Sequence, residues 1–254
     1  MSTSSRNTDA VMVIVDISGY TQFVRQRRIS LQHAEAIVTE LIESIIDRAT
    51  SPLVVNKLEG DAALLYAETR GERRAVILDV FAQLSAFFAG FEARLGRIKA
   101  ARSHCSCDAC ANIDSLQLKA FLHVGEIVIK KVRKFEEIAG ESVITIHRMT
   151  KNRLSLHEYI LMTEAFHAEG GDILPDLTEL LESIDGARAV LYWCGVRALA
   201  QHAPEFQPPI TEDRVPAISP GVHRVACFRH LPATGAAEMD LTWWRRLFAR
   251  RRDH

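Results

Sequence analysis

The chain has 254 residues, of which 48% are hydrophobic and 25% are charged, as in an ordinary globular protein with a substantial core. Lys and Arg total 31 against 32 for Asp and Glu, and this net charge of -1 argues against nucleic acid as a partner. No uninterrupted apolar run approaches the roughly 20 residues that span a bilayer, and the N-terminus has no apolar signal core, so we expect a cytoplasmic protein.

The first predicted element is a buried strand over residues 10–17, a continuous apolar run rich in Val and Ile. A helix is predicted over residues 31–49, where apolar side chains recur at helical spacing. The segments 52–58 and 62–66 then flank Gly60-Asp61, which predicts a β-hairpin with an acid at its tip. These elements alternate as β-α-β-β.

A second long helix over residues 72–100 and a strand pair, 116–123 and 126–131 around Gly125, extend this order to β-α-β-β-α-β. That order is the ferredoxin-like split unit, an α+β fold with a mostly antiparallel sheet and both helices on one face. Further elements are predicted over 141–154 (helix), 158–163, 187–193 and 222–230 (strands), and 164–186 (helical and loop-like). We expect one domain over residues 10–232, after a disordered tail of residues 1–9.

Two acids lie at the ends of predicted strands, each close to a glycine. Asp16 closes the first strand in the sequence Asp-Ile-Ser-Gly-Tyr-Thr, and Asp61 follows Gly60 at the hairpin tip. Such carboxylates suit a pair of Mg²⁺ ions beneath a triphosphate. Either motif alone is ordinary turn chemistry, but together, on neighbouring elements, they predict a metal and nucleotide site.

Four motifs, in order along the chain, carry a family resemblance. Residues 16–21 match Asp-Ile-x-Gly-Phe/Tyr-Thr, and residues 57–61 match a Lys-x-x-Gly-Asp hairpin. Residues 123–125 match His-x-Gly, and residues 140–148 look like a Gly-x-x-Val-Asn-x-x-x-Arg helix. In these motifs, over about residues 10–163, the chain resembles the catalytic domain of class III nucleotidyl cyclases, the adenylate and guanylate cyclases.

The resemblance implies a metal-dependent site for ATP or GTP, with ATP converted to cyclic AMP and pyrophosphate. Asp16 and Asp61 would be catalytic and would hold Mg²⁺ or Mn²⁺ together with the carbonyl of Ile17. Arg148 would stabilise charge on the phosphates in the transition state. The residues implied to bind the nucleotide are Ile17, Ser18, Gly19, Tyr20, Thr21, Lys57 and Glu137.

The chain also departs from the family pattern. Ile144 stands where catalytic members have an asparagine that orients the ribose, and no late phosphate-binding lysine is recognisable. We therefore expect a low-activity cyclase or, alternatively, a degenerate nucleotide-binding regulatory module. Family sites lie at a head-to-tail dimer interface. A homodimer is thus implied, with Asp16 and Asp61 of one chain in a different site from its Lys57 and Arg148.

An insertion over residues 104–112 carries the sequence Cys-x-Cys-x-x-Cys, which with His-x-Gly-Glu and His-Arg-Met-x-Lys-Asn further on resembles a bacterial subfamily known only as a domain of unknown function. Its candidate ligands are His104, Cys105, Cys107 and Cys110. Thiolates at this spacing suit Zn²⁺ or an iron-sulfur cluster. The fourth ligand stays open between His104, Cys194, Cys227 and a partner subunit, and a metal or redox sensor is a third interpretation of the chain.

The last segment, residues 233–254, is a basic amphipathic tail rich in Trp and Arg. A helix lying on the inner membrane face and a helix docked on protein both fit this pattern.

Overall fold

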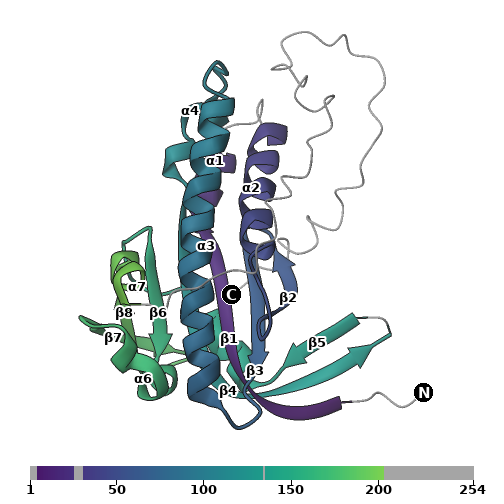
Figure 1. Ribbon diagram of the computed structural model, residues 1–254, viewed down its shortest axis with the longest axis vertical. Coiled ribbons are helices and arrows are strands. Elements are labelled where there is room, and N and C mark those ends of the chain that lie inside the picture. The colour runs from purple at the N-terminus through teal and green to yellow at the C-terminus, as the bar shows by residue number, and fades with distance from the viewer. Residues whose placement is uncertain (1–4, 26–30, 134, 203–254) are drawn as a thin grey trace. The chain divides into compact units, whose positions relative to one another are not determined.

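The computed structural model describes residues 5–25, 31–133 and 135–202 (Figure 1). The predicted strand over residues 222–230 and the basic tail over residues 233–254 lie outside these ranges. Both therefore stay predictions.

The described residues form an eight-stranded sheet in the order β2-β3-β1-β4-β6-β8-β7, with β5 paired to the end of β4. The strands are β1 (Ser5–Ser18), β2 (Val54–Glu59), β3 (Ala62–Glu68), β4 (Gln117–Val132), β5 (Phe135–Ala139), β6 (Tyr159–Thr163), β7 (Thr178–Ile184) and β8 (Ala187–Cys194). All neighbouring pairs are antiparallel except β4 and β6. The order β2-β3-β1-β4 is that of the predicted split unit, so the α+β prediction is confirmed.

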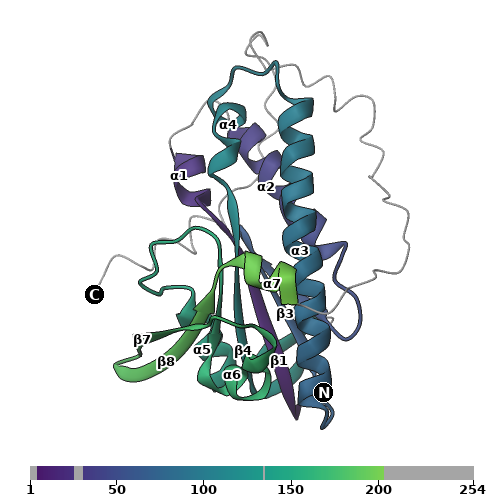
Figure 2. The ribbon, with the colours of Figure 1, turned by 60° about the vertical axis from the view of Figure 1, so that its left-hand side comes forward.

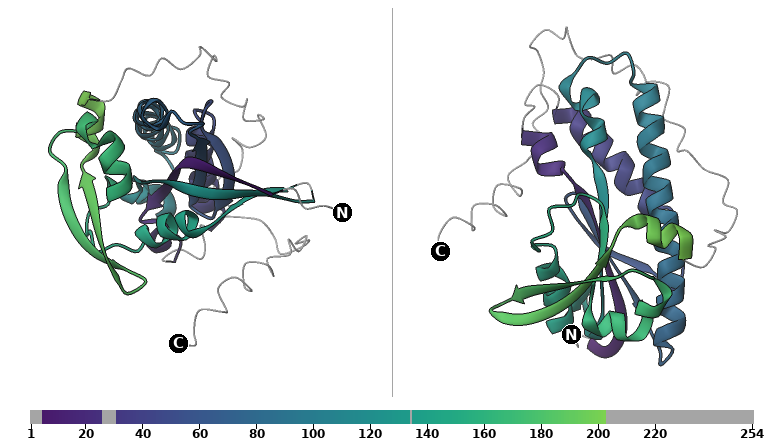
Figure 3. Two further views of the ribbon diagram at one scale, coloured as in Figure 1. Left: turned by 90° about the horizontal axis from the view of Figure 1, so that it is seen from below. Right: turned by 90° about the vertical axis from the view of Figure 1, so that its left-hand side faces the viewer.

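The helices cover both faces of this sheet. They are α1 (Tyr20–Arg25), α2 (Leu31–Ile46), α3 (Arg73–Ala101), α4 (Asp108–Ala111), α5 (Glu141–Met149), α6 (Glu164–Gly170) and α7 (Val196–His202). Helices α2 and α3 pack on one face, as predicted, and α5 packs on the other (Figure 3). Figure 2 shows α1, the start of α2 and α4 gathered at one end of the sheet.

Strand β1 runs through the centre and contributes to both cores. Val11, Val13 and Val15 pack with α2 and α3, whereas Met12 and Ile14 pack on the face of α5. Because side chains alternate along a strand, the next even-numbered residue continues the row on the α5 face. This alternation determines the side of the sheet on which the acid at the end of β1 lies.

Strand structure over residues 5–9 contradicts that part of the predicted N-terminal tail. Strand β1 begins at Ser5, whereas disorder was expected over residues 1–9. The first residues of β1, from Ser5 on, pair with β4. Arg6 makes two hydrogen bonds of 2.5 and 2.7 Å to the Glu68 carboxylate on β3. These side chains are polar, so a search for apolar runs starts the strand too late.

The predicted strand pair around Gly125 is wrong. Residues 117–132 form one uninterrupted strand, and Gly125 pairs with Ala10 in its middle. A Cβ at this glycine would lie 2.5 Å from Oγ of Ser142 on α5. The glycine therefore marks a close approach of helix to sheet rather than a turn.

A further segment differs from expectation. Residues 178–184, inside the segment expected to be helical and loop-like, form β7, in which no residue is buried. A strand with two solvated faces lacks the apolar alternation that identifies strands.

Helix α3 is long and apolar enough to cross a membrane by length and composition alone, although most of its apolar stretch is buried in the core.

Gly19 connects β1 to α1 in a conformation that suits glycine alone. Its φ is +86°, and a Cβ at this position would lie 2.6 Å from the carbonyl oxygen of Ser115. The carbonyl of Gly19 accepts a hydrogen bond of 2.9 Å from the amide of Phe23, which closes the first turn of α1. Gly19 thus allows the tight turn between β1 and α1, three residues after Asp16.

We predict that Gly19→Ala destabilises the fold more than Gly71→Ala does. Both glycines have a positive φ, +86° and +89°, but nothing lies within 4 Å of a Cβ at Gly71. Gly71→Ala should lower the free energy of unfolding by about 1–2 kcal/mol, the cost of a left-handed alanine. Gly19→Ala should lose a further ~1–3 kcal/mol in urea denaturation, because backbone must move. Equal losses would contradict this account of Gly19.

Candidate functional site

Asp16 and Asp61 meet at the end of the sheet where β1 leads into α1. Asp16 pairs with Ala62 in the β1–β3 ladder, which places Asp61 one residue from the facing position. The amide of Ile17 donates a hydrogen bond of 3.0 Å to the carbonyl of Asp61, which fixes the two segments to each other. The two half-buried acids are thus held together by backbone pairing.

The hairpin between β2 and β3 is short enough to hold its acid firmly. Glu59 pairs with Ala62, so Gly60 and Asp61 form a two-residue turn. Gly60 has a φ of +72°. A positive φ at the first central position is what the favoured two-residue hairpin turns require. Asp61 is therefore held at a defined position next to β1.

The two carboxylates repel each other in a partly buried place. Burial, and after it the negative charge of Asp16, raise the pKa of Asp61 to about 7. Burial also raises the pKa of Asp16. Within the part of the chain that the structure describes, neither acid has an ion-pair partner within 4.0 Å. A bound cation would relieve this repulsion, so hard carboxylate oxygens that fit Mg²⁺ or Mn²⁺ are in place.

Lys119 on β4 is a site residue that the sequence motifs miss. It pairs with Asp16 across the β1–β4 ladder, and its charge lowers the pKa of both Asp16 and Asp61 against the effect of burial. Its Nζ lies 5.6 Å from the centre of the Tyr159 ring. Only the register of β1 against β4 could have identified this lysine, because it belongs to none of the four motifs.

A third acid comes from α2. The hydroxyl of Tyr20 donates a hydrogen bond of 2.9 Å to Oε1 of Glu35, and the charge of Glu35 contributes to the raised pKa of Asp61. Glu35 therefore adds a third negative charge that acts near the end of β1, against the one positive charge of Lys119. This excess of negative charge favours cations.

The predicted phosphate-facing segment lies beside these acids, at the start of α1. Ser18 is buried, and its Oγ is 3.1 Å from Nδ1 of His157. Thr21 is exposed, and Gly19 and Tyr20 are half-buried. The segment therefore presents both backbone and side-chain groups near the two aspartates.

The other predicted nucleotide residues are paired elsewhere in the same chain. Lys57 pairs with Glu59 at 2.8 Å, and Arg148 pairs with Asp185 at 2.9 Å. Glu137 lies on β5, opposite Lys130 on β4, rather than on a strand beside β1. In the described residues these groups are not brought into contact with Asp16 and Asp61.

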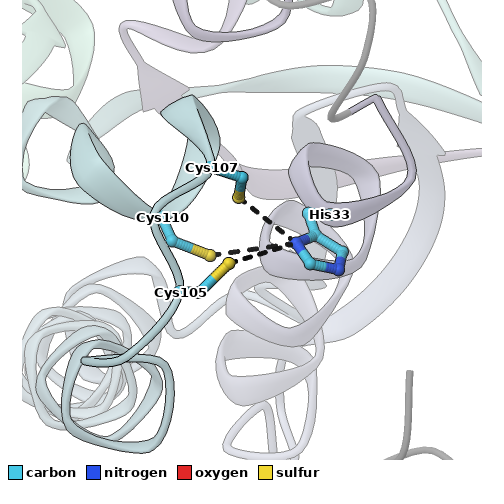
Figure 4. A group of neighbouring side chains, drawn as sticks. All are labelled: His33, Cys105, Cys107 and Cys110. Atoms are coloured by element: carbon cyan, nitrogen blue, oxygen red, sulfur yellow. Dashed lines mark hydrogen bonds between the residues drawn. The ribbon is translucent and has the colours of Figure 1, made fainter. Parts of the chain in front are cut away.

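A second cluster of ligand-type side chains lies on the opposite face of the sheet. Cys105, Cys107 and Cys110 surround His33, which lies in the first turn of α2 (Figure 4). Nδ1 of His33 is 3.3 Å from Sγ of Cys107 and 3.9 Å from each of the other two sulfurs. Burial, followed by the charge of Arg102, lowers the pKa of His33 and favours the neutral imidazole that metals bind.

The histidine in this cluster is not the predicted one. His104 is exposed and is not among the four side chains that converge, so its candidacy as a ligand is corrected to His33. Cys194 is buried in the core of the domain, and Cys227 lies outside the described residues. His33 is 72 residues before Cys105 and on another helix. Spacing along the sequence therefore could not reveal this histidine. The only signal in the sequence was that three cysteines leave a tetrahedral metal site one ligand short.

Two comparisons concern sequence relatives. The model of a protein family of unknown function, DUF2652, matches residues 38–159, which include the three clustered cysteines. A protein named uncharacterized protein Rv2561/Rv2562 from Mycobacterium tuberculosis is 36% identical over 128 residues. That match covers 50% of this chain and 57% of the relative, so it spans little more than half of the relative's length. Both findings agree with the predicted resemblance to a bacterial subfamily without an assigned reaction.

Solved structures identify the fold. The adenylyl cyclase CyaB from P. aeruginosa superposes with a TM-score of 0.57 at 11% identity, covering 75% of this chain and 95% of that one. A class III adenylyl cyclase-like ATP-binding protein from Pseudomonas aeruginosa superposes with a TM-score of 0.54 at 14% identity, covering 68% of this chain and 37% of that one. The chain has the class III nucleotidyl cyclase fold. At these identities the likeness concerns the fold alone, and this cyclase-like domain must be assigned a function from its own residues.

We predict that Asp61→Asn stabilises this cyclase-like domain only at higher pH. Between the ordinary value of 3.8 and the folded value of about 7, the unfolded chain ionises Asp61 while the folded chain keeps the proton. Stability therefore falls as pH rises through that interval, and the substitution removes the loss. In buffer without divalent ions, the melting temperature of Asp61→Asn should exceed that of wild type above pH 7 and approach it near pH 4. Asp79→Asn, on the exposed side of α3, is the control and should show no such trend.

Proposed function

We propose that this chain binds ATP through divalent cations held at Asp16 and Asp61 and converts it slowly to cyclic AMP and pyrophosphate. The observation that supports the proposal most is the pair itself: two half-buried carboxylates at adjacent strand ends, with the pKa of Asp61 raised to about 7. They occupy a cyclase fold at the positions where the family motifs predict the metal ligands. Within the described residues, neither Asp16 nor Asp61 has a Lys, Arg or His partner in an ion pair.

The residues of the site have distinct parts in this reaction. Bound Mg²⁺ or Mn²⁺ would supply activation of the ribose 3′-hydroxyl and charge stabilisation on the pyrophosphate. The hydroxyl oxygen forms a bond to the α-phosphorus, its proton is released, and the bond from that phosphorus to the pyrophosphate oxygen breaks. Asp16 and Asp61 would hold the cations. Lys119 favours their ionised forms, since its charge lowers the pKa of both acids.

A homodimer would complete the site. Lys57 and Arg148 pair with other acids of their own chain, 39% and 47% of each side chain being exposed, so both are accessible to a partner. Apolar Leu58 on β2 is 55% exposed, and contact with a partner would remove this apolar surface from water. In the head-to-tail arrangement that the family resemblance implies, the lysine and arginine of one chain serve the aspartates of the other.

A second candidate function is ATP binding without turnover, as a regulatory module. Ile144 favours it, because an isoleucine can neither donate nor accept the hydrogen bond that orients the ribose in catalytic members. One of the structures similar to this chain is itself named a cyclase-like ATP-binding protein. In this alternative, Asp16 and Asp61 keep their role in cation binding.

We predict that purified chain incubated with ATP and Mn²⁺ forms cyclic AMP and pyrophosphate, detectable by mass spectrometry, and that ATP raises its melting temperature. Asp16→Asn and Asp61→Asn should lower product formation by about 10²-fold or more, because each removes a cation ligand. Asp79→Asn should behave as wild type. Stabilisation by ATP without product would favour the regulatory module. If neither ATP nor GTP stabilises the protein or gives a cyclic product, both functions are refuted.

We predict that Ile144→Asn raises the rate of cyclic AMP formation by about 10-fold or more, because it restores an orienting hydrogen-bonding group. The side chain at this position is 54% exposed, so the core should tolerate the change. Ile144→Ala is the matched control, since it removes the same apolar group without adding a polar one. Equal rates for the two variants would contradict the role assigned to this position.

A further inference from the structure

We propose that His33, Cys105, Cys107 and Cys110 bind one Zn²⁺ ion, which holds the start of α2 against the segment around α4. The four side chains come from two distant parts of the chain and converge on one point (Figure 4). This site lies on the face of α2 and α3, whereas Asp16 lies on the face of α5. The assignment is therefore independent of the proposed nucleotide chemistry.

The spacing of the ligand atoms fits a single ion. With Zn–S near 2.3 Å and Zn–N near 2.0 Å, the ligand atoms of a tetrahedral site are about 3.5–3.8 Å apart. Nδ1 of His33 lies 3.3, 3.9 and 3.9 Å from the sulfurs of Cys107, Cys105 and Cys110, and all ligand atoms lie within 4.8 Å of one another. An ion at their centre requires only small side-chain adjustments.

The donor set selects the metal. Three thiols and one imidazole are the Cys₃His set of structural zinc sites, in which four protein ligands leave no position for a substrate. Soft sulfur donors disfavour Mg²⁺ and Ca²⁺. A multi-iron cluster would spread its ligands around several metal and sulfide atoms, farther apart than these four lie. The arrangement therefore favours zinc over an iron-sulfur cluster.

The surroundings hold the ligands in place before a metal arrives. Ala109 and Ile113 are 0% and 1% exposed, so the short segment that carries the thiols is rooted in the core. The carbonyl of Cys107 accepts a hydrogen bond of 3.0 Å from the amide of Ala111, and the amide of Cys105 donates one of 2.9 Å to the carbonyl of Arg102. Such preorganisation lowers the entropic cost of ion binding.

Charges near the site also match. Zn²⁺ with three thiolates carries a net charge of −1, and the charge of Arg102 acts on His33 from the end of α3. Arg102 is itself held by an ion pair of 2.8 Å with Glu40, two turns further along α2 from the histidine. The ion and this ion pair would fasten the same side of α2 to the connection between α3 and β4.

The test is the metal content of the full chain, purified anaerobically without chelators or added metal. We expect about one zinc per chain by mass spectrometry of the metals. After zinc is removed under reducing conditions, added Co²⁺ should give the visible bands of tetrahedral cobalt and the near-ultraviolet band of thiolate ligation. Iron with acid-labile sulfide, or a reduced protein that binds neither Zn²⁺ nor Co²⁺, would overturn the proposal.

Matched variants identify the ligands. Cys107→Ser and His33→Ala should each lower the zinc content and shift the Co²⁺ spectrum, while His104→Ala and Cys194→Ser should leave both unchanged. Loss of zinc in His104→Ala with retention in His33→Ala would overturn the assignment. The Co²⁺ spectrum of wild type decides the matter even if a ligand variant fails to fold. Asp61→Asn should keep its zinc, so a failure of the nucleotide proposal would not be mistaken for a failure of this one.

Discussion

The pairing of β1 with β3 on one side and β4 on the other is the constraint on which the rest of the structure depends. This double ladder places Asp16 beside the hairpin acid Asp61 and opposite Lys119. It also divides the core, because alternate residues of β1 contact α2 and α3 or α5. The chemistry at the end of β1 is thus a product of strand register, and a slip by one residue would turn Asp16 into the α2–α3 core.

The negative charges of Asp16 and Asp61 repel each other, and a bound cation would weaken this repulsion. Asp61 is partly buried next to Asp16 and is influenced by Glu35, and these effects raise its pKa to about 7. A fold selected for stability alone would place a neutral residue there, because burying like charges is unfavourable. Strongly shifted pKa values of this kind cluster at functional sites, where a ligand can supply the opposite charge.

Local sequence signals predicted much of the fold and the two acidic motifs that the fold brings together. The sequence singled out Asp16 and Asp61 because each lies in a short motif at a strand end, and it predicted α2 and α3 because apolar side chains recur along them at helical spacing. Gly125 was misread because a glycine that admits a neighbouring Ser142 looks like a turn. Lys119 and His33 were missed for one reason: their partners are far away in the sequence, and only tertiary structure brings them together.

Helix α2 links the two clusters. His33 and Glu35 are two residues apart, so they point in different directions from one helical turn. One meets the three thiols, and the other accepts the hydrogen bond from Tyr20 beside the paired aspartates. A displacement of this one turn would therefore move a side chain of each cluster at the same time.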